Sequence, residues 1–282
     1  MQTKDCPSND FSFQGLLYKT IYHSFTLFKS SLALIWHLFC RDFKAEYRQS
    51  LLGYLWALIP VLATTLTWVF LDQQNIVSIG STDLPYPIHV MLGSMLWGIF
   101  AKSLRGVMQG FSSGSSVFVK IKCSPIAFSL SGLSQVFFDL LLQCLLLIPA
   151  FFVFGIHFSP FILLAPLGML GLSLLGSAFG LLLIPIASLY HDVSRATAFA
   201  LSFLMYLTPV VYPVPKEGFA SVIVSYNPVT PLMECTRSLL TGSPIYNFVS
   251  LVWVLLFSLL LILVGIWFLR VSFPHLVSRM GS

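Results

Sequence analysis

Charged side chains are scarce in this sequence. Only 9% of its 282 residues are Asp, Glu, Lys or Arg, whereas 57% are hydrophobic; a soluble domain usually carries about 25% charged residues. A soluble core cannot account for this composition, because most of the chain would have to be buried in it. A lipid bilayer can, since it accepts apolar surface on every side of a helix. The composition therefore predicts an all-α integral membrane protein.

Motifs for nucleotide binding and hydrolysis are missing as well. The sequence contains no GxxxxGK[ST] phosphate-binding loop, no GxSxG and no HExxH. Its five cysteines and six histidines are scattered, so neither a disulfide framework nor a metal site is expected. We therefore expect a protein that is not an enzyme and that binds no cofactor or metal in its own chain.

What the sequence does have is a series of long apolar segments. A helix needs roughly 20 apolar residues to cross a bilayer, and six segments qualify: 50–71, 85–108, 125–155, 160–188, 195–213 and 246–269. Segments 125–155 and 160–188 exceed one crossing, and tilt or extension beyond the lipid would absorb the excess. The second segment carries Lys102 and Arg105 in its last turns, where both could snorkel to an interface.

The orientation follows from the distribution of Lys and Arg. Only Lys216 and Arg237 fall on the side that holds residues 214–245, whereas the other thirteen fall with the two termini. Because cytoplasmic loops carry the excess of positive charge, both termini are predicted to be cytoplasmic. The expected organisation is a cytoplasmic segment over 1–49, a transmembrane domain over 50–270 and a cytoplasmic tail over 271–282.

The segment before the first span has a helical pattern of its own. Its apolar residues recur at steps of three and four, which predicts an amphipathic helix in the headgroup layer; they are Ile21, Phe25, Phe28, Leu32, Ile35 and Phe39. A cytosolic helix that packs on another protein would give the same pattern.

Four stretches together resemble the ABC-2 type permeases that export polysaccharide, O-antigen or teichoic acid. RDFKAEYRQSLLGYLWALIPVL (41–62) is similar to the start of the family's first span. FVKIKCSPIAFSLSGLSQVFFD (118–139) looks like its cytoplasmic loop and third span. LYHDVSRATAFALSFLMYLTPVVYPVP (189–215) and SYNPVTPLMECTRSLLTG (225–242) resemble its fourth cytoplasmic turn with fifth span and its outer segment. One departure is His191, where the family often has Arg.

The resemblance implies a division of labour between subunits. Two copies of the permease would form one pathway in the bacterial inner (plasma) membrane, and two copies of a separate P-loop ATPase would bind ATP and Mg. The cargo would be a glycan on a lipid diphosphate carrier or a related wall polymer. A secondary transporter and a membrane-embedded lipid-linked sugar transferase are the alternatives. The first should show internal repeats and midplane ion-binding groups, and the second should show metal-binding acidic residues; neither feature is evident.

Several residues are candidates for contact with a glycan or its carrier. Sugars stack on aromatic rings, so rings in the first and fifth spans are predicted to line the path, although interface anchoring is an alternative for each of them: Tyr54, Trp56, Trp68, Tyr206 and Tyr212. Spacings of three and four place Arg41, Lys44 and Arg48 on one helix face before the first span. That face could grip the carrier diphosphate, or it could only enforce topology.

Other candidates concern assembly and coupling. Asp139 is the one clearly central acid of the spans, with Gln135 and Gln143 four residues to either side; we predict that it holds helices together, while transport of protons is the alternative. The 214–245 stretch predicts short gate helices at the outer surface, with Asn227, Pro228 and Arg237 in the family's register; an ordinary external loop is the alternative. Contact with the ATPase is predicted for the 109–124 loop and the next cytoplasmic turn, through Lys120, Lys122, His191 and Asp192, although the lysines could serve topology alone.

Overall fold

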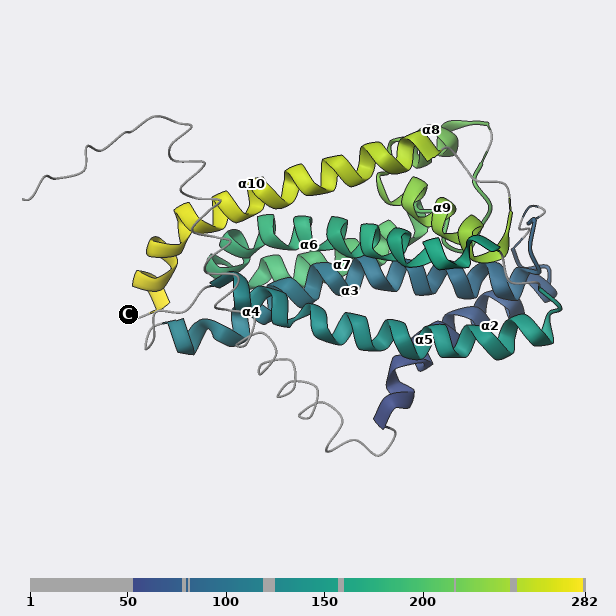
Figure 1. Ribbon diagram of the computed structural model, residues 1–282, viewed down its shortest axis with the longest axis horizontal. Helices are drawn as coiled ribbons and strands as arrows, with labels where there is room; N and C mark the ends of the chain where they lie inside the picture. Colours follow the sequence, from purple (N-terminus) through teal and green to yellow (C-terminus); the bar gives the residue numbers. More distant parts are fainter. Residues whose placement is uncertain are drawn as a thin grey trace, which may run out of the picture.

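The computed structural model describes residues 53–77, 80, 82–118, 125–156, 160–215, 217–243 and 248–280. Within these ranges all regular elements are helices, and the longer ones pack side by side along the long axis of the molecule (Figure 1). The predicted amphipathic helix before the first span, the basic face Arg41–Lys44–Arg48 and the lysines Lys120 and Lys122 lie outside the described residues.

Successive long helices run in opposite directions, which brings alternate connections to opposite ends of the bundle (Figure 1). The short helices α8 and α9 lie at the end where α2 finishes and α3 begins, and α4 and the end of α10 lie at the other. In chain order the elements are η1 (Gly53–Ala57), α2 (Ile59–Gln73), α3 (Tyr86–Phe118), α4 (Pro125–Ser131), α5 (Leu133–Val153), η2 (Pro160–Leu164), α6 (Ala165–Leu189), α7 (His191–Leu207), α8 (Phe219–Tyr226), α9 (Val229–Thr241) and α10 (Phe248–Met280).

Helices α3 and α6 form the centre of the bundle, and α6 also packs along α10. Glycines let the two central backbones approach closely: a Cβ added at Gly176 would lie 2.3 Å from the carbonyl oxygen of Phe100, and one at Gly180 would lie 2.7 Å from that of Leu104. Ser103 and Ser173 add a hydrogen bond of 3.0 Å between the same helices. Small residues at such contacts are the usual means of packing helices in lipid, where the helices gain no hydrophobic driving force from one another.

The outer surface of the bundle is strongly apolar. Large side chains such as Phe152, Phe199, Trp253 and Trp267 are more than half exposed. Soluble monomers rarely expose contiguous apolar surface on this scale, whereas lipid accepts it. The exposed rings and aliphatic side chains therefore support the prediction of an integral membrane protein.

Three helical stretches among the described residues are long and apolar enough to cross a membrane: Pro125–Val153, Pro160–Leu189 and Phe248–Leu276. Two further helices, α2 and α7, have 15 and 17 residues, which corresponds to about 22–26 Å against a hydrocarbon core of about 30 Å. Helix α3 has 33 residues but carries His89, Lys102 and Arg105. The all-helical class is confirmed, and the count of six spans stays a prediction.

The boundaries differ from the sequence expectation at two places. The third apolar segment is not one continuous helix but α4 and α5, which are divided at Gly132. The cytoplasmic turn predicted near 189–194 is reduced to Tyr190, because α7 already begins at His191. An acidic side chain in the first turn, Asp192, favours a helix start there.

Candidate functional site

Three of the aromatic residues predicted to line a glycan path lie together in the structure. The rings of Trp68 on α2 and Tyr206 on α7 are 6.4 Å apart between centroids and tilted by 54°. The hydroxyl of Tyr212, which follows α7 in a non-helical stretch, donates a 3.1 Å hydrogen bond to the backbone carbonyl of Tyr206. Tyr206 is 58% exposed, so the cluster opens onto the molecular surface. Such an arrangement offers ring faces for stacking and a surface that a second wall could close.

The other two predicted path residues are not part of this cluster as described. Trp56 lies in η1 and is 58% exposed, which fits an interface anchor as well as a path residue. Tyr54 also belongs to η1, and its side chain lies outside the described residues.

Asp139 forms an ion pair with Lys102, a partner that the sequence analysis did not predict. The carboxylate Oδ2 accepts a hydrogen bond from the Lys102 ammonium, which links α5 to α3. Lys102 could snorkel to an interface by the sequence reading; in the structure its side chain is 28% exposed and forms this ion pair. Ionisable groups inside a membrane usually pair with one another, so the presence of a cation in the second span and an acid in the third was the available signal.

The two glutamines flanking Asp139 have different surroundings. Gln143 is buried, and its Nε2 donates a 3.2 Å hydrogen bond to the carbonyl oxygen of Ala57 in η1. Gln135 is exposed. The polar residues of α5 therefore connect it both to α3, through Asp139, and to the segment that precedes α2, through Gln143.

Glycine–glycine contact brings α4, α5 and α3 together near this pair. A Cβ at Gly132 would lie 1.9 Å from the carbonyl oxygen of Gly106, and one at Gly106 would lie 2.5 Å from that of Gly132. A Cβ at Gly110 would likewise lie 2.2 Å from the carbonyl oxygen of Phe128. Side chains at these positions would hold the helices apart and lengthen the path from Lys102 to Asp139.

The residues predicted at the outer gate form a connected polar group. Asn227, between α8 and α9, donates to the hydroxyl of Thr208 at 2.8 Å and accepts from the backbone N–H of Val229 at 3.0 Å. It thereby satisfies an N–H at the start of α9, where helical partners are missing, and ties that start to the end of α7. Pro228 occupies the N-cap position of α9.

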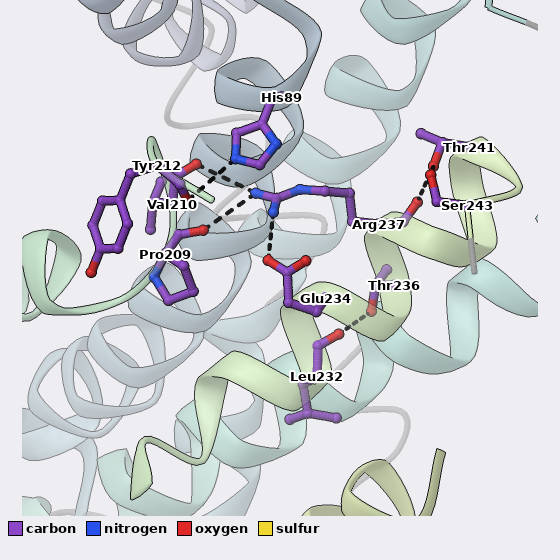
Figure 2. Close-up of polar contacts among 10 residues, drawn as sticks. All are labelled: His89, Pro209, Val210, Tyr212, Leu232, Glu234, Thr236, Arg237, Thr241 and Ser243. Carbon is purple, nitrogen blue, oxygen red and sulfur yellow. Dashed lines mark hydrogen bonds and ion pairs between the residues drawn. The ribbon is translucent and has the colours of Figure 1, made fainter. Parts of the chain in front are cut away.

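Arg237 is the most deeply buried charged residue among those described, with 4% of its surface exposed. Its Nη1 donates to Oε1 of Glu234 at 2.5 Å, and its Nη2 faces the carbonyl oxygens of Pro209 and Val210 at 3.4 Å each (Figure 2). Burial raises the pKa of the Glu234 carboxyl, against the opposing effect of the Arg237 charge. The count of Lys and Arg by side of the membrane does not address whether Arg237 is buried, and its three-residue spacing from Glu234 was the available signal for the pair.

The remaining predicted residues lie at the junction of α6 and α7. Asp192 and Arg195 form an exposed pair with 4.0 Å between Oδ1 and Nη1, and their side chains are 95% and 88% exposed. His191 begins α7, and its side chain lies outside the described residues. Exposed pairs of this kind contribute at most about 1 kcal/mol to folding, so Asp192 is available for contact with another subunit.

Comparison with known proteins gives consistent results. The family model of the ABC-2 type transporter matches residues 33–241. The chain is 22% identical over 219 residues to an O-antigen export system permease protein RfbA of Klebsiella pneumoniae, a match that covers 76% of this chain and 82% of the relative. It is 25% identical over 210 residues to a protein of the same name from Myxococcus xanthus, which covers 71% of this chain and 76% of the relative.

Proposed function

Because this chain belongs to the ABC-2 type transporter family, we propose that it is the membrane-spanning permease subunit of an ATP-driven exporter of lipid-linked polysaccharide. The cargo is an O-antigen-like, capsular or teichoic-acid-like polymer, and the exporter lies in the bacterial inner membrane with both termini of this chain in the cytoplasm. The observation that carries the proposal is the similarity to O-antigen export permeases over about three-quarters of both chains.

The aromatic cluster supports a path for sugar. The rings of Trp68, Tyr206 and Tyr212 offer faces on which sugar CH groups stack. Since Tyr206 is exposed at the surface of one copy, a closed path needs a second wall, and a second copy of this chain would supply it. We therefore propose a homodimer whose two aromatic clusters face the same path, with Tyr54 and Trp56 nearer its cytoplasmic entrance.

The motor is proposed to be a separate P-loop ATPase subunit, present in two copies, that holds the ATP and Mg. It contacts the cytoplasmic ends of the spans through Lys120, Lys122, His191 and Asp192. Asp192 is suited to this role because its side chain is almost fully exposed at the junction of two packed helices. A force applied there acts directly on α7, which carries Tyr206.

Co-expression with a P-loop ATPase encoded beside this chain's gene, if such a gene is present, tests the function. We expect the full chain to co-purify with the ATPase and to export glycan only when the ATPase hydrolyses ATP. Normal export with a hydrolysis-deficient ATPase would favour a secondary transporter, and sugar transfer by the purified chain alone would favour a transferase.

Asp192→Lys should lower recovery of the ATPase several-fold. Glu217→Lys reverses an exposed charge just before α8, a helix that lies at the opposite end of the bundle (Figure 1); it serves as the matched control and should leave recovery unchanged.

The basic face before the first span is proposed to bind the carrier diphosphate. Arg binds phosphate through two parallel N–H groups, whereas Lys offers a point charge. The double variant Arg41→Lys/Arg48→Lys keeps the charge that sets topology, so insertion and ATPase assembly should persist while export falls about tenfold and lipid-linked glycan accumulates in the cytoplasmic leaflet. Export at the normal rate in this variant would show that the cluster serves topology alone.

A further inference from the structure

The stretch that follows α7 is buried but not helical. Helix α7 ends at Leu207, and Thr208, Val210 and Val211 are each at most 3% exposed. Pro209 has no N–H to continue the helix, and within the stretch the Thr208 carbonyl accepts from the Val210 N–H. The carbonyl groups of Pro209, Val210 and Tyr212 face side chains of other helices instead. A buried carbonyl without a donor is costly, which makes the donors decisive for where this backbone lies.

Two other helices supply these donors. Arg237 on α9 directs Nη2 at the carbonyl oxygens of Pro209 and Val210, 3.4 Å from each. His89 on α3 places Nε2 3.4 Å from the carbonyl oxygen of Tyr212. Figure 2 shows both side chains directed at the same stretch of backbone. We call Arg237 and His89 together the carbonyl clamp.

Helix α3 is shaped to receive this backbone. One turn after His89 lies Gly93, where a Cβ would stand 2.0 Å from the carbonyl oxygen of Val210 and 2.8 Å from Nη2 of Arg237. Any side chain at this position would displace either the non-helical stretch or the guanidinium. Because Gly93 has no side chain, the Val210 carbonyl and the Arg237 guanidinium can both pack directly against α3 at this position.

Glu234 fixes the guanidinium so that it can do this. It holds Nη1 at 2.5 Å from the preceding turn of α9, which leaves Nη2 directed at the carbonyl groups (Figure 2). A planar guanidinium can donate to the Glu234 carboxylate and to the backbone carbonyl groups at the same time, whereas a lysine ammonium is a single point charge on a flexible side chain. Because Arg237 is 4% exposed, it is enclosed by protein and does not face a passing glycan.

We propose that Arg237 and His89 are positioning residues of the glycan path: they fix the backbone between Tyr206 and Tyr212 and so set how the two rings face the cargo. The inference rests on the proposed export function. The carbonyl groups that the clamp contacts belong to residues 209, 210 and 212. Residues 209 and 210 lie between the two tyrosines in the chain, and residue 212 is one of them. The Tyr212 hydroxyl also donates a hydrogen bond to the Tyr206 carbonyl. Release of the clamp would let the stretch between the rings change its course without unfolding α7 or α9.

A double variant separates the clamp from the ion pair. Arg237→Met alone would leave the Glu234 carboxylate buried and unpaired, whereas Glu234→Leu/Arg237→Met removes both charges, a change that is often neutral for stability. The charge exchange Glu234→Arg/Arg237→Glu retains an ion pair, but position 237 then has no group that can donate to the carbonyl oxygens of Pro209 and Val210. His89→Phe removes the donor to Tyr212 alone. Thr241→Val, one turn beyond Arg237 on α9, is the matched control, because it loses only local hydrogen bonds, to the Arg237 carbonyl and to the Ser243 hydroxyl.

The position of the stretch can be read without measuring transport. A Cβ at Gly80 would lie 3.5 Å from Cγ of Pro213, so a cysteine pair at 80 and 213, in a chain otherwise free of cysteine, should form a disulfide within one polypeptide. We expect the rate of disulfide formation in the purified full chain to fall at least fivefold in both double variants and about twofold in His89→Phe. Thr241→Val should leave it unchanged.

Export is measured in parallel with native cysteines. We expect a loss of about tenfold in both double variants, a smaller loss in Arg237→Lys, and normal membrane levels throughout. Normal export in both double variants, or unchanged disulfide formation, would refute the positioning role while leaving the export function intact. If the unsubstituted chain exports no glycan but disulfide formation still falls in the variants, the function is refuted and the carbonyl clamp is supported.

Discussion

Replacement of Asp139 by Leu is expected to destabilise the protein by about 3 kcal/mol, because it leaves the Lys102 ammonium in apolar surroundings without its carboxylate. The double variant Lys102→Met/Asp139→Leu removes both charges and should recover most of the loss. Gln135→Leu, one turn away on the exposed side of α5, should change stability little and serves as the control. The measurement is the free energy of unfolding of the purified full chain in mixed micelles.

Asp139→Asn distinguishes structure from transport. It keeps the shape of the side chain and can still accept a hydrogen bond from Lys102, so we expect assembly close to normal and export reduced only in proportion to stability. A variant that assembles with full stability but exports nothing would mean that the charge itself takes part in transport. The structural role of Asp139 would then be wrong.

The second large effect is expected at the contact between two glycines. Gly132→Ala places a Cβ 1.9 Å from the carbonyl oxygen of Gly106, and because the obstacle is backbone, neither side can yield by rotating a side chain. We expect a loss of about 3 kcal/mol, at the upper end of overpacking effects, measured by the same unfolding assay.

Gly98 on α3 offers the matched control for this substitution. A Cβ there meets nothing within 4 Å, and Ala is favoured over Gly in a helix by about 1 kcal/mol. Gly98→Ala should therefore be neutral or slightly stabilising. If both substitutions had the same effect, the close approach of α3 to the start of α5 would be contradicted.

The sequence predicted the helices because their cause is local. Apolar length is set by the thickness of the bilayer, and each apolar segment overlaps one of α2, α3, α5, α6, α7 and α10, although single ends differ by up to eleven residues. The division at Gly132 was not predicted, nor was the contact of Gly132 with the backbone of Gly106 on another helix. A contact between helices depends on their rotation and depth, which apolarity alone does not determine.

The same distinction holds for the candidate site. Residue types suggested that Trp68, Tyr206 and Tyr212 belong to one path, and the structure brings them together, although their role is a proposal. The Lys102–Asp139 pair and the contact of Arg237 with Val210 were not predicted, because their members lie 37 and 27 residues apart, whereas the i,i+3 pair of Glu234 and Arg237 could have been read from the sequence. Counting charges by side of the membrane also treats a buried arginine and an exposed one alike.

The close contact between α3 and α6 has a consequence for the transport cycle. With the carbonyl oxygens of Phe100 and Leu104 seated against Gly176 and Gly180, a slide of either helix by one turn would bring one of these oxygens to the other glycine but would place the second against the side chain of Leu172 or Ile184. We therefore expect these two helices to keep their register during transport. In the proposed coupling through Asp192, movement would then fall to the surrounding helices, and α7 would carry it to the aromatic cluster.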